Sequence, residues 1–296
     1  STPIKSSAAS DVYKRQKLVL SVKSESFGSV LPVSYQYELS AAVYRRIREN
    51  FELYLHWLSS NGFAPIDDCR NRLFSFSNLY IPRIRVEYDR LHILVKRVQM
   101  WISFLPVRGT HEFVKQLFSG ETFVLGDRRS RVELEVEDIV ECPAPEFGEE
   151  AEYLALSPIV FMVARPNRSM EYVGPDYPGY ADCFYRSVLG KYEKIFGRPF
   201  DGDTGFSWSL LSEPKRKGIF MMRFTPEESK VIGYMYKFKL SMSPILHQIM
   251  YETGIGEKVN LGFGCVEILR QDTTPNDQNF LSDCLLYTSD AADDLI

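Results

Sequence analysis

The sequence predicts an α+β fold in which one order of elements, β-α-β-β-α-β, occurs twice along the chain. Runs rich in β-branched and aromatic residues alternate with segments whose apolar residues recur at helical spacing. A proline-containing acidic segment, ECPAPEFGEE (141–150), separates the two series and is typical of a linker. Hydrophobic residues make up 45% of the chain, which favours packed domains over disorder.

The first series begins with a strand-like run, KLVLSVK, at 17–23. The segment 38–61 predicts a long helix, because its apolar residues fall on one helical face: Leu39, Val43, Ile47, Phe51, Tyr54 and Leu58. Two β-rich runs, a short helix and a final strand follow, at 73–88, 91–105, 110–119 and 131–141.

The second series repeats this order after the linker. It comprises a strand, a helix, two strands, a helix and a strand, at 153–164, 178–196, 218–224, 230–240, 243–253 and 261–269. The two series share an order of elements and no obvious sequence identity. We therefore expect two tandem ferredoxin-like (RRM-like) domains, over 17–145 and 151–275, each an antiparallel sheet with helices on one face.

Both ends of the chain match translations of a DNA adapter used to prepare sequencing libraries. One strand of that adapter encodes SSAASDVYKRQ (6–16), and its reverse complement encodes CLLYTSDAAD (284–293). We therefore expect residues 1–16 and 284–296 not to be native, and we leave them out of the prediction of fold and function.

Composition narrows the classes of function that the protein can have. The net charge is −4, so any binding of nucleic acid would depend on a local basic patch and not on a basic protein as a whole. No C-x-x-C pair, and no His, Cys or Asp cluster at metal-ligand spacing, occurs in the sequence. With no signal peptide and no long apolar run, we expect a cytoplasmic protein without cofactor, metal site or membrane partner.

The segment TGIGEKVNLGFGCVE (253–267) stands between the last predicted helix and the last predicted strand. Its glycines allow positive φ and close approach of the backbone to a partner, so the loop could surround phosphate groups. It could also be a tight turn packed against the other domain. A dinucleotide-binding role is not favoured, because the loop does not connect a first strand to a helix. The residues of this loop that could contact phosphate are Gly254, Gly256, Lys258, Asn260, Gly262 and Gly264.

This loop resembles the glycine-rich loop of the repeat-associated RNA-binding proteins of CRISPR systems. More narrowly, it is similar to that of CRISPR-associated endoribonuclease family six, which has a G-x-G-E-K-N-x-x-G-F-G type of loop. Three further stretches agree with the family in order and spacing: YELSAAVY (37–44), RLFSFS (72–77) and LSPIV (156–160). The resemblance spans essentially all of 17–283.

The resemblance implies that the protein cuts the repeat portion of a CRISPR precursor transcript and holds the product. The implied reaction needs no metal: the ribose 2′-hydroxyl attacks the adjacent phosphate and leaves a 2′,3′-cyclic phosphate and a 5′-hydroxyl. A base, an acid and a donor to the phosphorane charge would assist it. The implied partners are CRISPR repeat RNA, its precursor crRNA and the proteins of a CRISPR effector complex.

The resemblance also implies catalytic positions. Tyr44 matches the family's tyrosine, and Arg72 stands at its basic position, which is usually Lys. WLSSNGF (57–63) departs from the family pattern, because Ser59 stands where His is expected. His56 lies three residues earlier, nearly one helical turn away.

Each candidate also has a purely structural interpretation. Tyr44 could be a packing residue of its helix, His56 a surface histidine and Arg72 a solvated charge at a strand edge. Three functions therefore stay open: an endoribonuclease, a catalytically silent repeat-RNA binder, and a structural subunit of a CRISPR effector complex.

Overall fold

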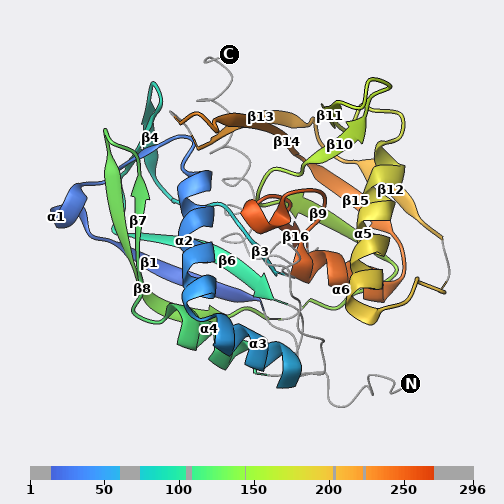
Figure 1. The fold of residues 1–296 in the computed structure, drawn as a ribbon, viewed down its shortest axis with the longest axis horizontal. Helices are drawn as coiled ribbons and strands as arrows, with labels where there is room; N and C mark the ends of the chain where they lie inside the picture. Colours follow the sequence, from blue (N-terminus) through green and yellow to red (C-terminus); the bar gives the residue numbers. More distant parts are fainter. Residues whose placement is uncertain are drawn as a thin grey trace.

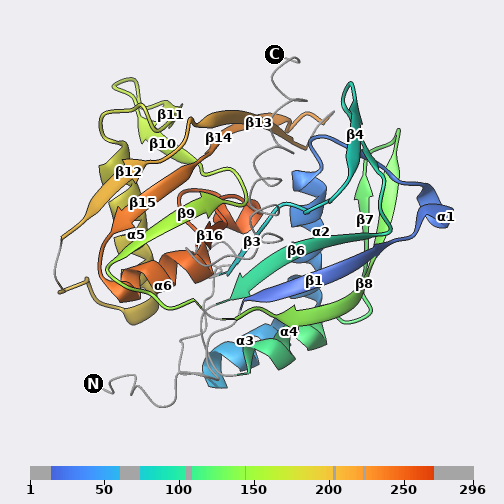
Figure 2. The same ribbon diagram turned by 180° about the vertical axis from the view of Figure 1, so that it is seen from behind.

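Two α+β halves lie side by side in the protein (Figure 1). In each half, helices cover one face of an antiparallel sheet, as the view from behind also shows (Figure 2). The predicted α+β class is thereby confirmed. A computed structural model of the chain describes residues 15–60, 74–104, 109–143, 145–202, 205–222 and 225–269.

The first domain is built on a five-stranded sheet with the order β3-β6-β1-β8-β7. Its strands are β1 (Gln16–Val22), β3 (Phe74–Phe76), β6 (Arg97–Phe104), β7 (Thr122–Gly126) and β8 (Arg131–Glu141). Leu18 and Leu20 of β1 alternate with more exposed neighbours and are fully buried. The edge strand β7 was not predicted, and the other four strands fall within predicted runs except that β1 begins one residue earlier, at Gln16.

Three helices cover this sheet: α2 (Gln36–Glu49), α3 (Phe51–Ser60) and α4 (Thr110–Phe118). The sequence predicted α2 and α3 as one continuous helix. The break lies at Asn50, whose side-chain amide donates a 2.9 Å hydrogen bond to the carbonyl of Arg46. An asparagine side chain that binds a helix carbonyl competes with the next backbone N–H, so the chain turns there.

A small three-stranded sheet, of order β2-β5-β4, stands beside the main one. It contains β2 (Val30–Pro32), β4 (Ile84–Glu87) and β5 (Arg90–Ile93), and the short helix α1 (Ser24–Phe27) precedes it. The run predicted as a single strand over 73–88 therefore supplies strands to two different sheets. Pro82 lies between them, and it lacks the N–H that a continuous strand would need.

The second domain has a four-stranded sheet of order β12-β15-β9-β16. Its strands are β9 (Glu150–Ala155), β12 (Ser207–Leu210), β15 (Lys237–Ser241) and β16 (Val266–Ile268), and its helices are α5 (Tyr180–Phe196) and α6 (Pro244–Thr253). Two of the helix boundaries have a local cause. Pro244 begins α6, and Gly197, at a φ of 68°, ends α5.

The predicted middle strands of this sheet were partly wrong. The runs at 218–224 and 230–240 overlap β13 (Lys215–Met221) and β14 (Ser229–Met235), which pair with each other as a separate ribbon. The end of the second run also overlaps β15, which does enter the sheet. The strands that enter the sheet are β12 and β15. A second ribbon, β10 (Phe161–Ala164) with β11 (Met170–Val173), likewise leaves the sheet.

Each domain has its own apolar core, one under α2 to α4 and one under α5 and α6. The chain also contributes to the interface between them before the boundary expected at 17. β1 begins at Gln16, and the buried side chain of Arg15 donates hydrogen bonds to the carbonyls of Val266 (2.7 Å) and Tyr251 (2.6 Å). Both Arg15 and Gln16 belong to the segment that we expect to be adapter-encoded.

Candidate functional site

The glycine-rich loop joins α6 to β16 and lies beside α2 and β3 of the first domain (Figure 1). A short 3₁₀ turn at Val259–Leu261 forms its outer part. All four glycines have positive φ: Gly254 (74°), Gly256 (83°), Gly262 (82°) and Gly264 (69°). This region of backbone conformation is unfavourable for residues with a Cβ, so the loop shape itself calls for glycine.

Protein contacts also exclude a Cβ at these glycines. At Gly264 a Cβ would lie 1.8 Å from the carbonyl oxygen of Ile255, and at Gly256 it would lie 2.4 Å from that of Val160. At Gly262 it would meet the ring of Phe76 at 2.5 Å. Gly254, Gly262 and Gly264 are buried, so the turn between domains accounts for these three glycines.

Hydrogen bonds tie the loop to the first domain. The side-chain amide of Gln36, at the start of α2, donates to the carbonyl of Gly262. The hydroxyl of Ser75 in β3 donates to the carbonyl of Glu252 at 3.1 Å. The loop is therefore held by both halves of the protein.

The outer part of the loop carries the polar candidates. Lys258 and Asn260 are half-exposed, and Lys258 takes a φ of 56° at the start of the 3₁₀ turn. The N–H of Glu257 donates a 2.7 Å hydrogen bond to the carbonyl of Val160, which fixes the base of this segment. One lysine is thus presented to solvent on a fixed turn at the junction of the domains.

Strand β3 connects the loop to the predicted catalytic tyrosine. The half-buried Tyr44 ring packs edge-on against Phe74, with centroids 5.8 Å apart. The next residues of the same strand, Ser75 and Phe76, contact the loop side. Tyr44 and the glycine loop therefore border the same three-residue strand.

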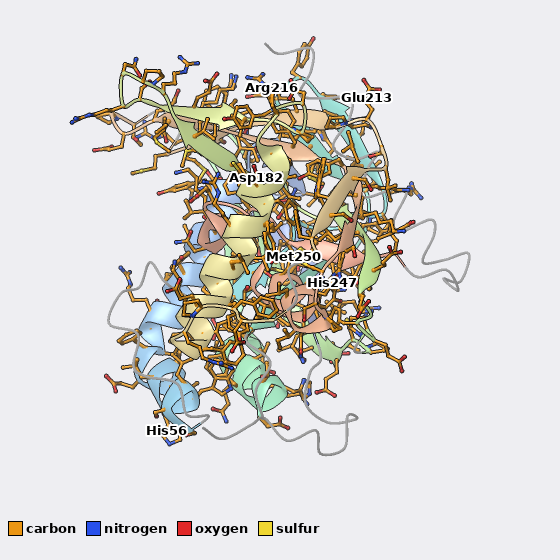
Figure 3. All side chains as sticks on the ribbon, turned by 90° about the vertical axis from the view of Figure 1, so that its right-hand side faces the viewer. His56, Asp182, Glu213, Arg216, His247 and Met250 are labelled. Carbon is orange, nitrogen blue, oxygen red and sulfur yellow. The ribbon has the colours of Figure 1, made fainter. Side chains whose placement is uncertain are left out.

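The other predicted catalytic residues do not border β3 in the described part of the chain. His56 and Ser59 are exposed on α3, and the Ser59 hydroxyl donates a 3.1 Å hydrogen bond to the carbonyl of His56. Figure 3 shows His56 at the far end of the helical layer, pointing away from the protein. Arg72 lies outside the described residues.

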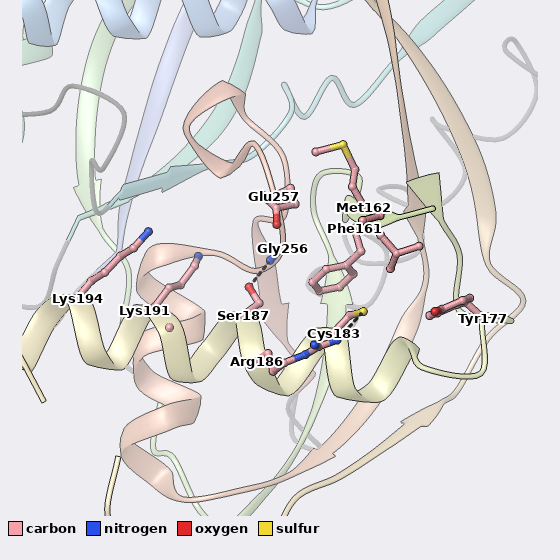
Figure 4. Close-up of a pocket in the computed structure, with 13 residues that line it drawn as sticks. Phe161, Met162, Tyr177, Cys183, Arg186, Ser187, Lys191, Lys194, Gly256 and Glu257 are labelled. Atoms are coloured by element: carbon pink, nitrogen blue, oxygen red, sulfur yellow. Dashed lines mark hydrogen bonds between the residues drawn. The ribbon is translucent and has the colours of Figure 1, made fainter. Parts of the chain in front are cut away.

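A cleft that the sequence did not predict lies beside the loop (Figure 4). It has a volume of about 560 Å³ and is bounded by β10, one face of α5 and the loop residues Gly256 and Glu257. Three cations on that face of α5 line it: Arg186, Lys191 and Lys194. Their helical spacing was visible in the sequence, but nothing there showed which face would meet the loop.

Lys191 anchors the cleft to the loop. Its amine donates hydrogen bonds to the carbonyls of Thr253 (2.7 Å) and Gly254, at the end of α6. Burial, and then the neighbouring Lys194, lower the pKa of Lys191 to about 7. Part of the positive charge on this face is therefore sensitive to pH near neutrality.

A buried carboxyl group lies under the same end of α6. Glu252 is 3% exposed, and burial raises its pKa to about 7, against the lowering effects of Arg15 and of a hydrogen bond from Ser103. His247, in the same helix, is fully buried between the Tyr153 hydroxyl (2.8 Å) and the carbonyl of Glu149 (3.2 Å). Burial lowers the pKa of His247, which suits a structural, neutral imidazole.

The described residues contain neither a metal-binding cluster nor a membrane-spanning helix. No group of three His, Cys, Asp or Glu side chains in the described ranges is arranged to hold a metal ion. Within the same part of the chain, no helix combines the length and the apolar character needed to cross a membrane.

Comparison with known proteins shows which family and which fold the chain resembles. Residues 142–268 match the family described as CRISPR associated protein Cas6, C-terminal. A protein of Pyrococcus horikoshii with the provisional name CRISPR-associated endoribonuclease-like protein Cas6nc is 24% identical over 247 residues, which cover 81% of this chain and 94% of that protein.

Two solved structures share the fold over almost the whole chain. The product of a Cas6-related gene from Pyrococcus furiosus is 21% identical, with a TM-score of 0.72 over 88% of this chain and 100% of the other. A structure described as a RAMP protein binding different RNA substrates is 22% identical, with a TM-score of 0.70 over 87% and 100%. The resemblance to the Cas6 family and the expected pair of ferredoxin-like domains are confirmed.

Proposed function

We propose that this chain, a relative of the Cas6 proteins, binds CRISPR repeat RNA in precursor transcripts and cleaves it to crRNA. The observation that carries the proposal is the glycine loop: its outer part presents Lys258 and Asn260 at the domain junction, and its inner part rests on the strand that also supports Tyr44. A lysine and backbone N–H groups on a fixed turn are suited to the phosphates of an RNA strand. The proposed compartment is the cytoplasm.

The proposed chemistry is metal-independent transfer of the phosphate to the ribose 2′-hydroxyl. The 2′-oxygen attacks the adjacent phosphorus and loses its proton, the bond to the 5′-oxygen breaks, and that oxygen takes up a proton. Tyr44 and His56 or Ser59 are the proposed proton-transfer groups, and Arg72 is the proposed donor to the charge on the phosphorane. Lys258 and Asn260 hold the RNA backbone.

A second candidate function is binding of repeat RNA without cleavage. Ser59 at the expected histidine position, and His56 exposed at the far end of α3, favour it. A serine hydroxyl, whose pKa lies far above neutrality, cannot exchange protons as an imidazole can. The subunit of a CRISPR effector complex that the sequence left open would be a binder of this kind.

Incubation of the full chain with end-labelled CRISPR repeat RNAs in EDTA tests both functions. Under the first proposal the RNA is cut, and the products carry a 2′,3′-cyclic phosphate and a 5′-hydroxyl that polynucleotide kinase can label. Retention of intact RNA in a gel-shift assay, without cleavage, supports the silent binder. Absence of both binding and cleavage contradicts both functions.

A further inference from the structure

The cleft beside the glycine loop contains a helical glycine that the protein's own packing does not explain. Gly190 lies in the middle of α5, and a Cβ built there would have no described atom within 4 Å. A glycine inside a helix makes the helix less stable than an alanine would. Gly190 therefore has room for a side chain, and that room is part of the cleft.

The cations of the cleft are placed on the same side as this glycine. Arg186 and Lys194 are exposed and, with Lys191 between them, extend along one face of α5. In Figure 4, Lys191 and Lys194 point from α5 toward the side on which the loop and Glu257 lie. Glu257 is the one acidic residue of the described lining, so the charge of the cleft is positive.

The other wall supplies apolar and aromatic surface. Met162 and Val163 of β10 line it, and the Tyr177 ring, which is 39% exposed, stands at its end. A concave site with cations along one wall and an aromatic ring at the other matches what single-stranded nucleic acid requires, since bases stack on rings and phosphates follow cations.

We propose that this cleft binds an unpaired segment of RNA, with Arg186 and Lys194 on its phosphates and a base against Tyr177. The absence of a side chain at Gly190 lets the RNA approach the backbone of α5. The proposal rests on the proposed function, because Gly256 and Glu257 join the cleft to the glycine loop and make the two sites one continuous surface. It extends the bound segment beyond the phosphate held by Lys258.

Phosphate bound in the cleft would change the protonation of Lys191. Lys191 faces Lys194 across one helical turn, Glu257 from the loop and the two carbonyls at the end of α6. An additional anion favours the charged form of the amine, so binding raises the pKa of Lys191 and takes up a proton near neutral pH.

Variants at Gly190 give a direct test, because both replacements suit a helix. Fluorescence anisotropy would measure binding of fluorescein-labelled decauridylate and of labelled CRISPR repeat RNA to the full chain. Gly190→Leu places a bulky side chain in the cleft and should weaken decauridylate binding by roughly tenfold or more, whereas Gly190→Ala should change it much less. Equal affinity of the wild type and Gly190→Leu would overturn the inference.

A double variant that removes two positive charges gives a second test. Arg186→Ala with Lys194→Ala should weaken binding and reduce the slope of log affinity against log salt by about 1.4, or about 0.7 per phosphate contact. Arg198→Ala is the matched control: Arg198 lies just beyond α5, is paired with Asp201 at 2.9 Å and does not line the cleft. Equal effects of the double variant and of the control would contradict a site in the cleft.

The two probes separate this inference from the proposed function. Suppose that the wild type binds repeat RNA, and that neither Gly190→Leu nor the double variant alters the affinity for repeat RNA or for decauridylate. The cleft inference then fails and the proposed function stands. If decauridylate binds in the cleft and no repeat RNA is bound better than decauridylate, recognition of repeat RNA fails and the cleft inference stands.

Discussion

The amide of Ile255 donates a 2.8 Å hydrogen bond to the carbonyl of Gly264, and this contact closes the glycine loop at its neck. The two backbones are so close that a Cβ on Gly264 would lie 1.8 Å from the oxygen of Ile255. The loop can therefore take this shape only if residue 264 has no side chain.

Gly264→Ala should therefore destabilise the protein by more than about 3 kcal/mol, because left-handed strain and a backbone clash add together. Gly197→Ala is the matched control. Gly197 has a φ of 68°, and no described atom lies within 4 Å of the place that a Cβ would take, so that variant should lose only about 1 kcal/mol. Urea unfolding measures both. Equal losses would mean that the neck relaxes and does not constrain the loop.

Lys258→Gln should weaken the binding of many RNAs to a similar extent and reduce the salt slope by about 0.7, because one phosphate contact is lost. The measurement is anisotropy over a series of salt concentrations. Lys239→Gln serves as a control, since that lysine lies on β15 and pairs with Glu150 at 2.8 Å. An unchanged slope for Lys258→Gln would leave the loop with a structural role alone.

Ser59→His should raise the single-turnover cleavage rate by a large part of the ~10²–10⁴-fold that a positioned acid or base contributes. The side chain is exposed, so the change should not disturb folding. The rate of this variant should acquire a dependence on a group with a pKa of about 6.5. His56→Ala shows whether the parent already uses a neighbouring imidazole.

If the parent cuts fast and His56→Ala abolishes cleavage, then His56 is the active histidine and Ser59 is not its position. If neither substitution alters the rate, cleavage depends on Tyr44, Arg72 and substrate positioning, or it does not occur.

Glu252→Gln should stabilise the protein increasingly as pH rises from 4.5 to 7. The folded protein keeps the proton of Glu252 up to about pH 7, whereas the unfolded chain releases it near its ordinary value of 4.5. The folded state thus binds the extra proton between these values, and the stability of the wild type falls across this window. Above pH 7 the ionised Glu252 lowers the free energy of unfolding of the wild type by at most about 3 kcal/mol.

Unfolding free energies of the wild type and Glu252→Gln, measured from pH 4.5 to 8, would show this difference. A constant difference would mean that Glu252 is ionised throughout, with Arg15 and Ser103 compensating for its burial.

The order of the main helices and strands was largely predictable, but several short elements and the partners of each strand were not. Alternating apolar residues identified β13 and β14 as strands, but β12, with the sequence SWSL, has the same period and enters the sheet in their place. Periodicity describes the faces of a strand, whereas pairing depends on tertiary contacts between segments far apart in sequence.

Of the candidate site, the loop was predictable from the sequence and the cleft was not. The glycines and Lys258 stand together in the sequence, so their loop could be found there. The cleft draws residues from β10, α5 and the loop, which only the fold brings together. The burial of Gly262 against Phe76 was also beyond reach, because it depends on how the second domain meets β3.

The loop belongs to the second domain and rests on a strand of the first, and this order has a consequence for biosynthesis. Domains tend to fold in turn as they leave the ribosome. The first half can complete its sheet while residues 254–264 are still untranslated. A nascent chain at that stage has Tyr44 in place and no loop opposite it, so the surface that we propose for RNA is incomplete. Translation that stops early would release a folded half without the glycine loop.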